Sequence, residues 1–141
     1  MKIRYIVLII LLGSLLGQCR QPAGKEEMQQ DSAEQEGVPR IEFEKVYHDF
    51  GRLEAGEVVS YSFTFRNTGT ADLIVKDAHA SCGCTVPKFD KEPIAPGEEG
   101  SIEVIFDSSG RRGNQYKSAI VKLNTPYGEK TLTIKANIVT N

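Results

Sequence analysis

Alternation of apolar and polar side chains constrains the fold of this chain more than any other feature. It is clearest where Val59, Tyr61, Phe63 and Phe65 are separated by two serines and a threonine. In an extended strand this period of two places the apolar side chains on one face, which is then buried, and the polar ones in water. The segment is therefore predicted to be a half-buried β-strand, and no stretch after Gly37 keeps a helical period.

Shorter segments with a similar pattern recur along the chain, separated by turns rich in glycine and proline. They are Ile41–Phe43, Val46–Phe50, Leu73–Val75, Ile102–Phe106, Ala119–Leu123 and Leu132–Ile138. Together with the first segment they make about seven short strands, which is typical of an immunoglobulin-like antiparallel sandwich. The sequence therefore predicts an all-β domain of this kind, with a small barrel as the alternative.

Residues 1–18 have the layout of a signal peptide. Two positive side chains precede an apolar run, Tyr5–Leu12, that is too short for a spanning helix. Leu16 lies three residues before Cys19, as in a lipoprotein signal, while the bulky Gln18 departs from that pattern. We therefore predict lipidation of Cys19 and an outer-membrane envelope protein that faces the periplasm or the surface. The alternative is a secreted protein with one spare thiol.

Residues 19–37 carry few apolar side chains and are predicted to be a disordered tether, followed by one domain over residues 38–141. Removal of residues 1–18, with their two positive side chains, moves the net charge from -2 to -4. The domain itself has 13 basic and 14 acidic side chains and offers no electrostatic footprint for nucleic acid. The predicted partners are therefore the membrane, through the lipid on Cys19, and another envelope protein.

The remaining two cysteines, Cys82 and Cys84, are separated by one glycine. In an extended strand their side chains share a face with the Cα atoms about 6.6 Å apart, near the upper limit for a disulfide, and a positive φ at Gly83 would bring them closer. Two thiolates at this spacing can also bind copper or zinc, with His79 as a third ligand, although in a continuous strand His79 points to the opposite face. Three interpretations stay open: a structural or idle pair, which we favour, a thiol-redox pair, and a metal site.

Two other residue pairs could carry chemistry. His48-Asp49 could act as a ligand or an acid–base pair, and Arg111-Arg112 could hold an anion. A strand-end histidine and a solvated turn are the more frequent roles of such pairs. No nucleophile-elbow, phosphate-loop or metalloprotease pattern is present in the sequence. We therefore predict a non-enzymatic binding or scaffolding module with no catalytic residues and no cofactor.

Several short motifs follow one another in a specific order: His48-Asp49-Phe50-Gly51, Gly56-Glu57, Phe63–Gly69, Leu73–Val75, Ser81–Thr85, Ile94–Glu98, Phe106-Asp107 and Gly110-Arg111. In this order they resemble the bacterial domain of unknown function catalogued as number fifteen seventy-three, over nearly all of residues 40–140. The resemblance implies an immunoglobulin-like sandwich related to pilus-chaperone and sperm-protein-type domains, in secreted or lipid-anchored proteins. It implies no activity, because the family has no established one.

Overall fold

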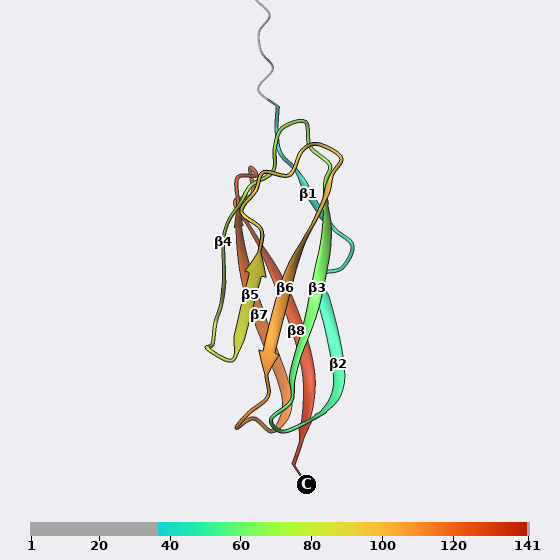
Figure 1. Ribbon diagram of the computed structural model, residues 1–141, viewed down its shortest axis with the longest axis vertical. Coiled ribbons are helices and arrows are strands. Elements are labelled where there is room, and N and C mark those ends of the chain that lie inside the picture. Colours follow the sequence, from blue (N-terminus) through green and yellow to red (C-terminus); the bar gives the residue numbers. More distant parts are fainter. Residues whose placement is uncertain (1–36, 141) are drawn as a thin grey trace, which may run out of the picture. The chain divides into compact units, whose positions relative to one another are not determined.

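The computed structural model describes residues 37–140, so the predicted signal peptide, Cys19 and all of the predicted tether except Gly37 lie outside the described residues. The described residues form eight strands and no α-helix (Figure 1). The strands are β1 (Ile41–Phe43), β2 (Tyr47–Glu54), β3 (Val58–Asn67), β4 (Val75–Ala80), β5 (Thr85–Phe89), β6 (Glu99–Asp107), β7 (Gly113–Leu123) and β8 (Glu129–Val139). No helix among these residues is long and apolar enough to cross a membrane.

The strands form two four-stranded sheets, with the orders β1-β3-β6-β5 and β2-β8-β7-β4. All neighbouring strands are antiparallel except β2 and β8, which run parallel. The predicted immunoglobulin-like sandwich is confirmed, with one strand more than the seven that the sequence pattern indicated. The additional strand is β5, in which Val86 and Pro87 are adjacent apolar residues and the sequence shows no apolar–polar alternation.

The core lies between the inner faces of the two sheets and consists of the alternating apolar side chains. The largest fully buried apolar residues are Phe63, Phe65, Leu73, Ile102, Val104, Phe106, Val121, Leu132 and Ile134. Phe63 lies opposite Ile102 on neighbouring strands, so β3 and β6 contribute adjacent core side chains. The periodicity thus identified the buried face of the central strands correctly.

The N-terminal part of the chain changes from one sheet to the other. β1 pairs with the end of β3, and the last bond of this pair runs from the Glu44 N–H to the Thr64 carbonyl, at 3.1 Å. The chain then crosses, and the Thr133 N–H of β8 donates to the Val46 carbonyl at 2.9 Å, just before β2 begins. Figure 1 shows β1 beside the upper part of β3 and β2 in the lower half of the sandwich. Each sheet is therefore left with an edge that this segment covers over only part of its length.

The predicted strand at Leu73–Val75 is displaced in the structure. Leu73 makes only an isolated bridge to Ile94, and β4 begins at Val75. The expected distance between the cysteines assumed that the strand continues through them. In the structure it does not, because β4 ends at Ala80 and the chain turns into β5 of the other sheet. The extended geometry expected for the cysteine segment was therefore wrong.

Candidate functional site

Cys82 and Cys84 form a disulfide in the turn between β4 and β5, with their Cα atoms 5.4 Å apart. The Thr85 N–H donates to the Cys82 carbonyl at 3.3 Å and closes this turn. Gly83 does not have the positive φ that the sequence suggested, so the turn itself brings the cysteines together. The disulfide lies where the chain crosses from one sheet to the other.

The surroundings of the disulfide are those of a structural link. Cys84 packs against the hydrophobic core, and its carbonyl accepts a hydrogen bond from the Asp107 N–H of β6 at 2.9 Å. Thr85 is buried, and its Oγ1 lies 3.7 Å from the Cys82 sulfur and 3.9 Å from the Cys84 sulfur. These contacts attach the turn to β6, which fits the structural interpretation of the pair.

His79, the third candidate metal ligand, is paired with a carboxylate. Its Nδ1 lies 3.2 Å from Asp77 Oδ2, and both side chains are about half exposed on β4. Among residues 37–140, no group of three or more His, Cys, Asp or Glu side chains could hold a metal ion. Within this part of the chain the cysteine pair therefore has no ligands with which to complete a metal site.

His48 has a packing role. Its ring, on β2, stacks on Tyr61 of β3 with 3.7 Å between the ring centroids and 12° between the planes, and it meets the edge of Phe50 at 4.6 Å. Burial lowers the pKa of His48, the positive charge of Lys45 lowers it further, and the negative charge of Asp49 opposes them. The neutral imidazole thus closes the gap between the two sheets at this level.

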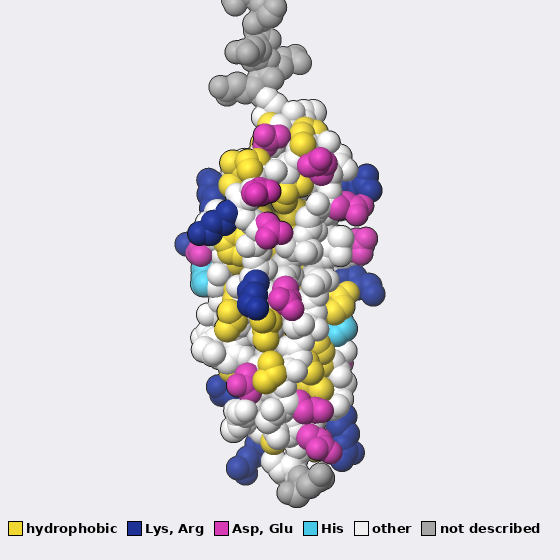
Figure 2. Space-filling model, in the orientation of Figure 1, with side chains coloured by type: hydrophobic (Ala, Val, Ile, Leu, Met, Phe, Trp, Pro, Cys, Tyr) yellow, Lys and Arg dark blue, Asp and Glu magenta, His cyan; other side chains and the backbone are white. Residues whose placement is uncertain are grey.

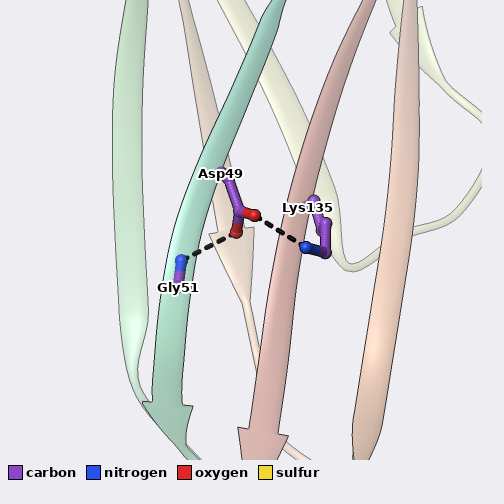
Figure 3. A network of polar contacts seen from close by, with 3 residues as sticks. All are labelled: Asp49, Gly51 and Lys135. Carbon is purple, nitrogen blue, oxygen red and sulfur yellow. Dashed lines mark hydrogen bonds and ion pairs between the residues drawn. The ribbon is translucent and has the colours of Figure 1, made fainter.

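Asp49 is bonded to groups other than its histidine neighbour. Its Oδ2 accepts a hydrogen bond from Lys135 Nζ at 2.8 Å, and its Oδ1 accepts one from the Gly51 N–H at 2.9 Å (Figure 3). These two hydrogen bonds, the first being the stronger influence, lower the pKa of Asp49. Gly51 has a φ of +71° in the irregular part of β2, so Asp49 stabilises a bulge and links β2 to β8.

Arg111 and Arg112 lie in the loop between β6 and β7. The Arg111 N–H donates to the Ser108 carbonyl at 3.0 Å, and the Arg112 carbonyl accepts from Gln115 Nε2 at 2.8 Å. Arg112 is exposed, and Arg111 is partly buried. The contacts of the two residues are those of a turn, which agrees with the more frequent role for such a pair.

A groove that the sequence did not indicate lies between the segment that leads into β1 and the hairpin that joins β7 to β8. Its volume is about 550 Å³. One wall is the segment 38–42, which includes Ile41 and Glu42 of β1, and the other is formed by the end of β7, the following hairpin and the start of β8. We call this the β1–β8 groove; its lining residues are Val38, Pro39, Arg40, Ile41, Glu42, Thr68, Leu123, Thr125, Pro126, Tyr127, Glu129 and Lys130.

The N-terminal wall of the groove is held by the turn that follows β3. The Thr68 N–H donates to the Arg40 carbonyl at 3.0 Å, and the Thr70 N–H donates to the Val38 carbonyl at 2.9 Å. A side chain at Gly69 would overlap with the backbone of this wall, which explains the glycine. The Asn-Thr-Gly motif thus fixes the position of the segment that lines the groove.

Charge of neither sign is concentrated on the face seen in Figure 2. In Figure 2, Lys and Arg side chains and Asp and Glu side chains are interspersed on the face in view, with hydrophobic side chains between them. The groove follows the same rule, because Arg40 and Lys130 are balanced by Glu42 and Glu129. Selection of a partner by net charge is therefore not expected at this face or at the groove.

Comparison with protein families assigns the chain. A family model described as "Protein of unknown function (DUF1573)" matches residues 41–138, from the first residue of β1 nearly to the end of β8. The chain belongs to the DUF1573 family. The match includes the cysteine turn, the Asn-Thr-Gly turn and most of the lining of the β1–β8 groove. The sequence matches no curated protein at the significance required.

Solved structures similar to this DUF1573 domain support the fold. A protein of unknown function from Porphyromonas gingivalis W83 matches with a TM-score of 0.60 and 20% identity, over 72% of this chain and 46% of that chain. The ASH/PapD-like domain 7 of human CEP192 matches with a TM-score of 0.57 and 11% identity, over 72% and 86%. The YadV chaperone matches with a TM-score of 0.51 and 10% identity, over 70% and 51%. The DUF1573 domain thus has a PapD-like, immunoglobulin-like fold, and this chain spans about half of the Porphyromonas protein.

Proposed function

We propose that the protein is a non-enzymatic lipoprotein of the cell envelope whose DUF1573 domain is a binding or scaffolding module. The lipoprotein part of the proposal is supported by the signal-like sequence 1–18 and by Cys19 after it. Residues 19–37, which are polar and acidic, are the tether that holds the domain away from the membrane. The PapD-like fold is compatible with this role but does not itself identify a partner.

The observation that carries the binding function is the β1–β8 groove. It combines apolar lining from Ile41, Leu123 and Pro126 with exposed strand edges on both walls, as in sites that bind a protein segment. The alternative, thiol redox or copper and zinc handling by Cys82 and Cys84, is not favoured. The disulfide closes a turn against the core, and no group of three or more His, Cys, Asp or Glu side chains among the described residues could hold a metal ion.

Metabolic labelling with palmitate tests the anchor. The wild-type protein should carry the label and fractionate with membranes, whereas Cys19→Ser should lose both properties. The matched control is the Cys82→Ser/Cys84→Ser double variant, which removes the other two thiols and should keep the label. An unlabelled wild-type protein, or a labelled Cys19→Ser variant, would refute the anchor.

Cross-linking in the native cells tests the binding module. The tagged full-length protein is cross-linked, recovered from envelopes and compared by quantitative mass spectrometry with the Cys19→Ser variant, which the proposal removes from the membrane. At least one envelope protein should be enriched with the anchored form. The absence of any partner above the level of the variant would remove the support for a binding function.

A further inference from the structure

We infer that the β1–β8 groove binds an extended peptide segment of a partner protein, which adds as a strand to the edge of β8. This inference rests on the proposed binding function and specifies its site and the chemistry of its partner.

The edge of β8 that continues from the groove, beyond the lining residues Glu129 and Lys130, has backbone groups without partners. In the ladder with β7, the Leu123 N–H donates to the Gly128 carbonyl. Because bonded positions alternate along an antiparallel pair, Lys130 and every second residue after it direct their backbone N–H and carbonyl groups toward β7. Thr131 and Thr133 therefore face the other way. The Thr133 N–H bonds to Val46, but among the described residues the Thr131 N–H and carbonyl bond to nothing.

The facing wall presents a second edge of the same kind. On β1, the Arg40 carbonyl and the Glu44 N–H bond to β3, so Ile41 and Phe43 direct their N–H and carbonyl groups away from β3. The groove thus lies between an edge of one sheet and an edge of the other. Donors and acceptors that repeat every second residue on a strand are complementary to an extended main chain and to few other ligands.

The remaining edge strands carry features that oppose strand addition. β5 has Pro87 at a position directed away from β6, because the Asp107 N–H bonds to the Cys84 carbonyl and the bonded positions alternate from there. β2 is irregular between Asp49 and Arg52, and β4 is irregular between Val75 and Asp77. The start of β8 has neither a proline nor a bulge, and its unpaired stretch from Glu129 to Leu132 is longer than the three-residue β1, so it is the edge best suited to accept a strand.

The part of β3 that β1 does not cover is a further free edge, and side chains close it. Below β1, the outward groups of β3 at Ser60 and Ser62 have no strand beside them, but at this level His48 stacks on Tyr61 and fills the space between the sheets. Among the described residues no aromatic pair joins the two walls of the groove, because Phe43 of β1 packs on Phe65 of its own sheet. The space for an added strand is therefore at β8.

The rim and the length of the free edge define the peptide. β8 is unpaired on this side from Glu129 to Leu132, which corresponds to about 13 Å of strand, or four residues. Tyr127, 93% exposed at the tip of the hairpin, and Val38, 42% exposed, offer apolar contacts at the rim. Charges of both signs surround the groove, so the expected partner is a short, apolar, near-neutral segment in extended conformation, rather than a nucleic acid or an acidic tail.

A phage-displayed library of random twelve-residue peptides, selected on the full-length protein, tests this inference. Peptides that alternate apolar residues should be enriched, and Thr131→Pro, which removes the free N–H, should weaken their binding at least tenfold. The matched control is Ser60→Pro on the edge closed by His48, which should bind normally. Tyr127→Ala cannot disturb the core and should weaken binding several-fold, whereas Tyr116→Ala, at an exposed tyrosine that does not line the groove, should have no effect.

A measurement on the wild-type protein covers the case in which Thr131→Pro does not fold. Addition of a selected peptide should slow hydrogen exchange at the Thr131 amide, and amides of β5 should not change. The inference would be overturned if the peptides bound both proline variants and both tyrosine variants equally, or if they protected another sheet edge from exchange. Either result would place the site elsewhere, although a binding function would survive. A dimer that dissociates in Tyr127→Ala would assign the groove to a second copy of the chain and also overturn it. No enrichment of any peptide would refute the inference even if cross-linking in cells recovers a partner.

Discussion

Replacement of Asn67 by alanine is expected to destabilise the domain by about 3 kcal/mol. The Asn67 side chain is 0% exposed. Its Nδ2 donates to the Ala71 and Ile94 carbonyls at 2.8 Å each, and its Oδ1 accepts from the Gly69 N–H at 2.9 Å. A net contribution of about 1 kcal/mol per hydrogen bond gives about 3 kcal/mol for the three. This is a large part of the roughly 5–15 kcal/mol that stabilises a typical domain.

Urea unfolding of the full-length protein, followed by circular dichroism, measures this effect. With an m-value of about 1.5 kcal/mol/M, the midpoint of Asn67→Ala should fall by about 2 M and the slope should stay the same. The matched control is Asn137→Ala, at an exposed asparagine, which should change the free energy of unfolding by less than about 0.5 kcal/mol. Equal midpoints for the two variants would refute the assignment of Asn67 as the residue that holds the turn.

Asn67→Asp separates hydrogen bonding from shape. The aspartate has nearly the same size, but when ionised it faces two carbonyl oxygens with no proton to donate, so its pKa in the folded protein should be raised above about 3.9. Since the folded state then binds the proton more tightly than the unfolded state, the variant should be less destabilised at pH 4 than at pH 7. A destabilisation that is the same at both pH values would contradict this explanation.

Three further predictions concern the stability of the domain. Gly69→Ala should cost at least about 2 kcal/mol and lower the melting temperature by about 10 °C, because the added Cβ meets the backbone of the N-terminal wall, whereas Gly83→Ala, with open space at its Cβ, should melt like the wild type. Since the pKa of His48 is lowered on folding, its contribution to stability is complete above about pH 6.5 and is lost as the pH falls toward the folded-state pKa. Between pH 7.5 and 5.5 the melting temperature of His48→Phe should therefore fall less than that of the wild type. An equal fall in the two proteins would count against the neutral stacked ring. The Cys82→Ser/Cys84→Ser double variant should lose at most about 2 kcal/mol, because the disulfide closes a very small loop, and a much larger loss in urea unfolding would show that the disulfide does more than close a turn.

The alternating strands could be predicted because the order of apolar and polar residues in each segment determines which of its faces is buried. Phe63 and Phe65 face the core, as their period of two requires. β5 could not be predicted in this way, because its burial alternates but its residue types do not: the apolar Val86 lies on the exposed face, and Pro87 follows it directly. The geometry of Cys82 and Cys84 was missed for a related reason, since the crossing between sheets is decided by tertiary packing.

The β1–β8 groove could not be predicted from patterns in the sequence. The groove exists because the chain leaves one sheet after Glu44 and joins the other at Tyr47, and this crossing leaves Thr131 of β8 without a neighbour. Neither fact has a local sequence signature. The Asn67 and Gly69 motif could be recognised in the sequence, but its role in holding the wall of the groove becomes visible only from the hydrogen bonds to Val38 and Arg40.

Site-specific photo-cross-linking in living cells tests most directly whether the DUF1573 domain holds a partner in the β1–β8 groove. The photoreactive amino acid p-benzoylphenylalanine replaces Tyr127 at the rim of the groove or Tyr116, an exposed tyrosine on β7 that does not line it. Irradiation should produce a discrete adduct with another envelope protein from position 127 and none from position 116. No adduct from position 127, or the same adduct from both positions, would contradict the account.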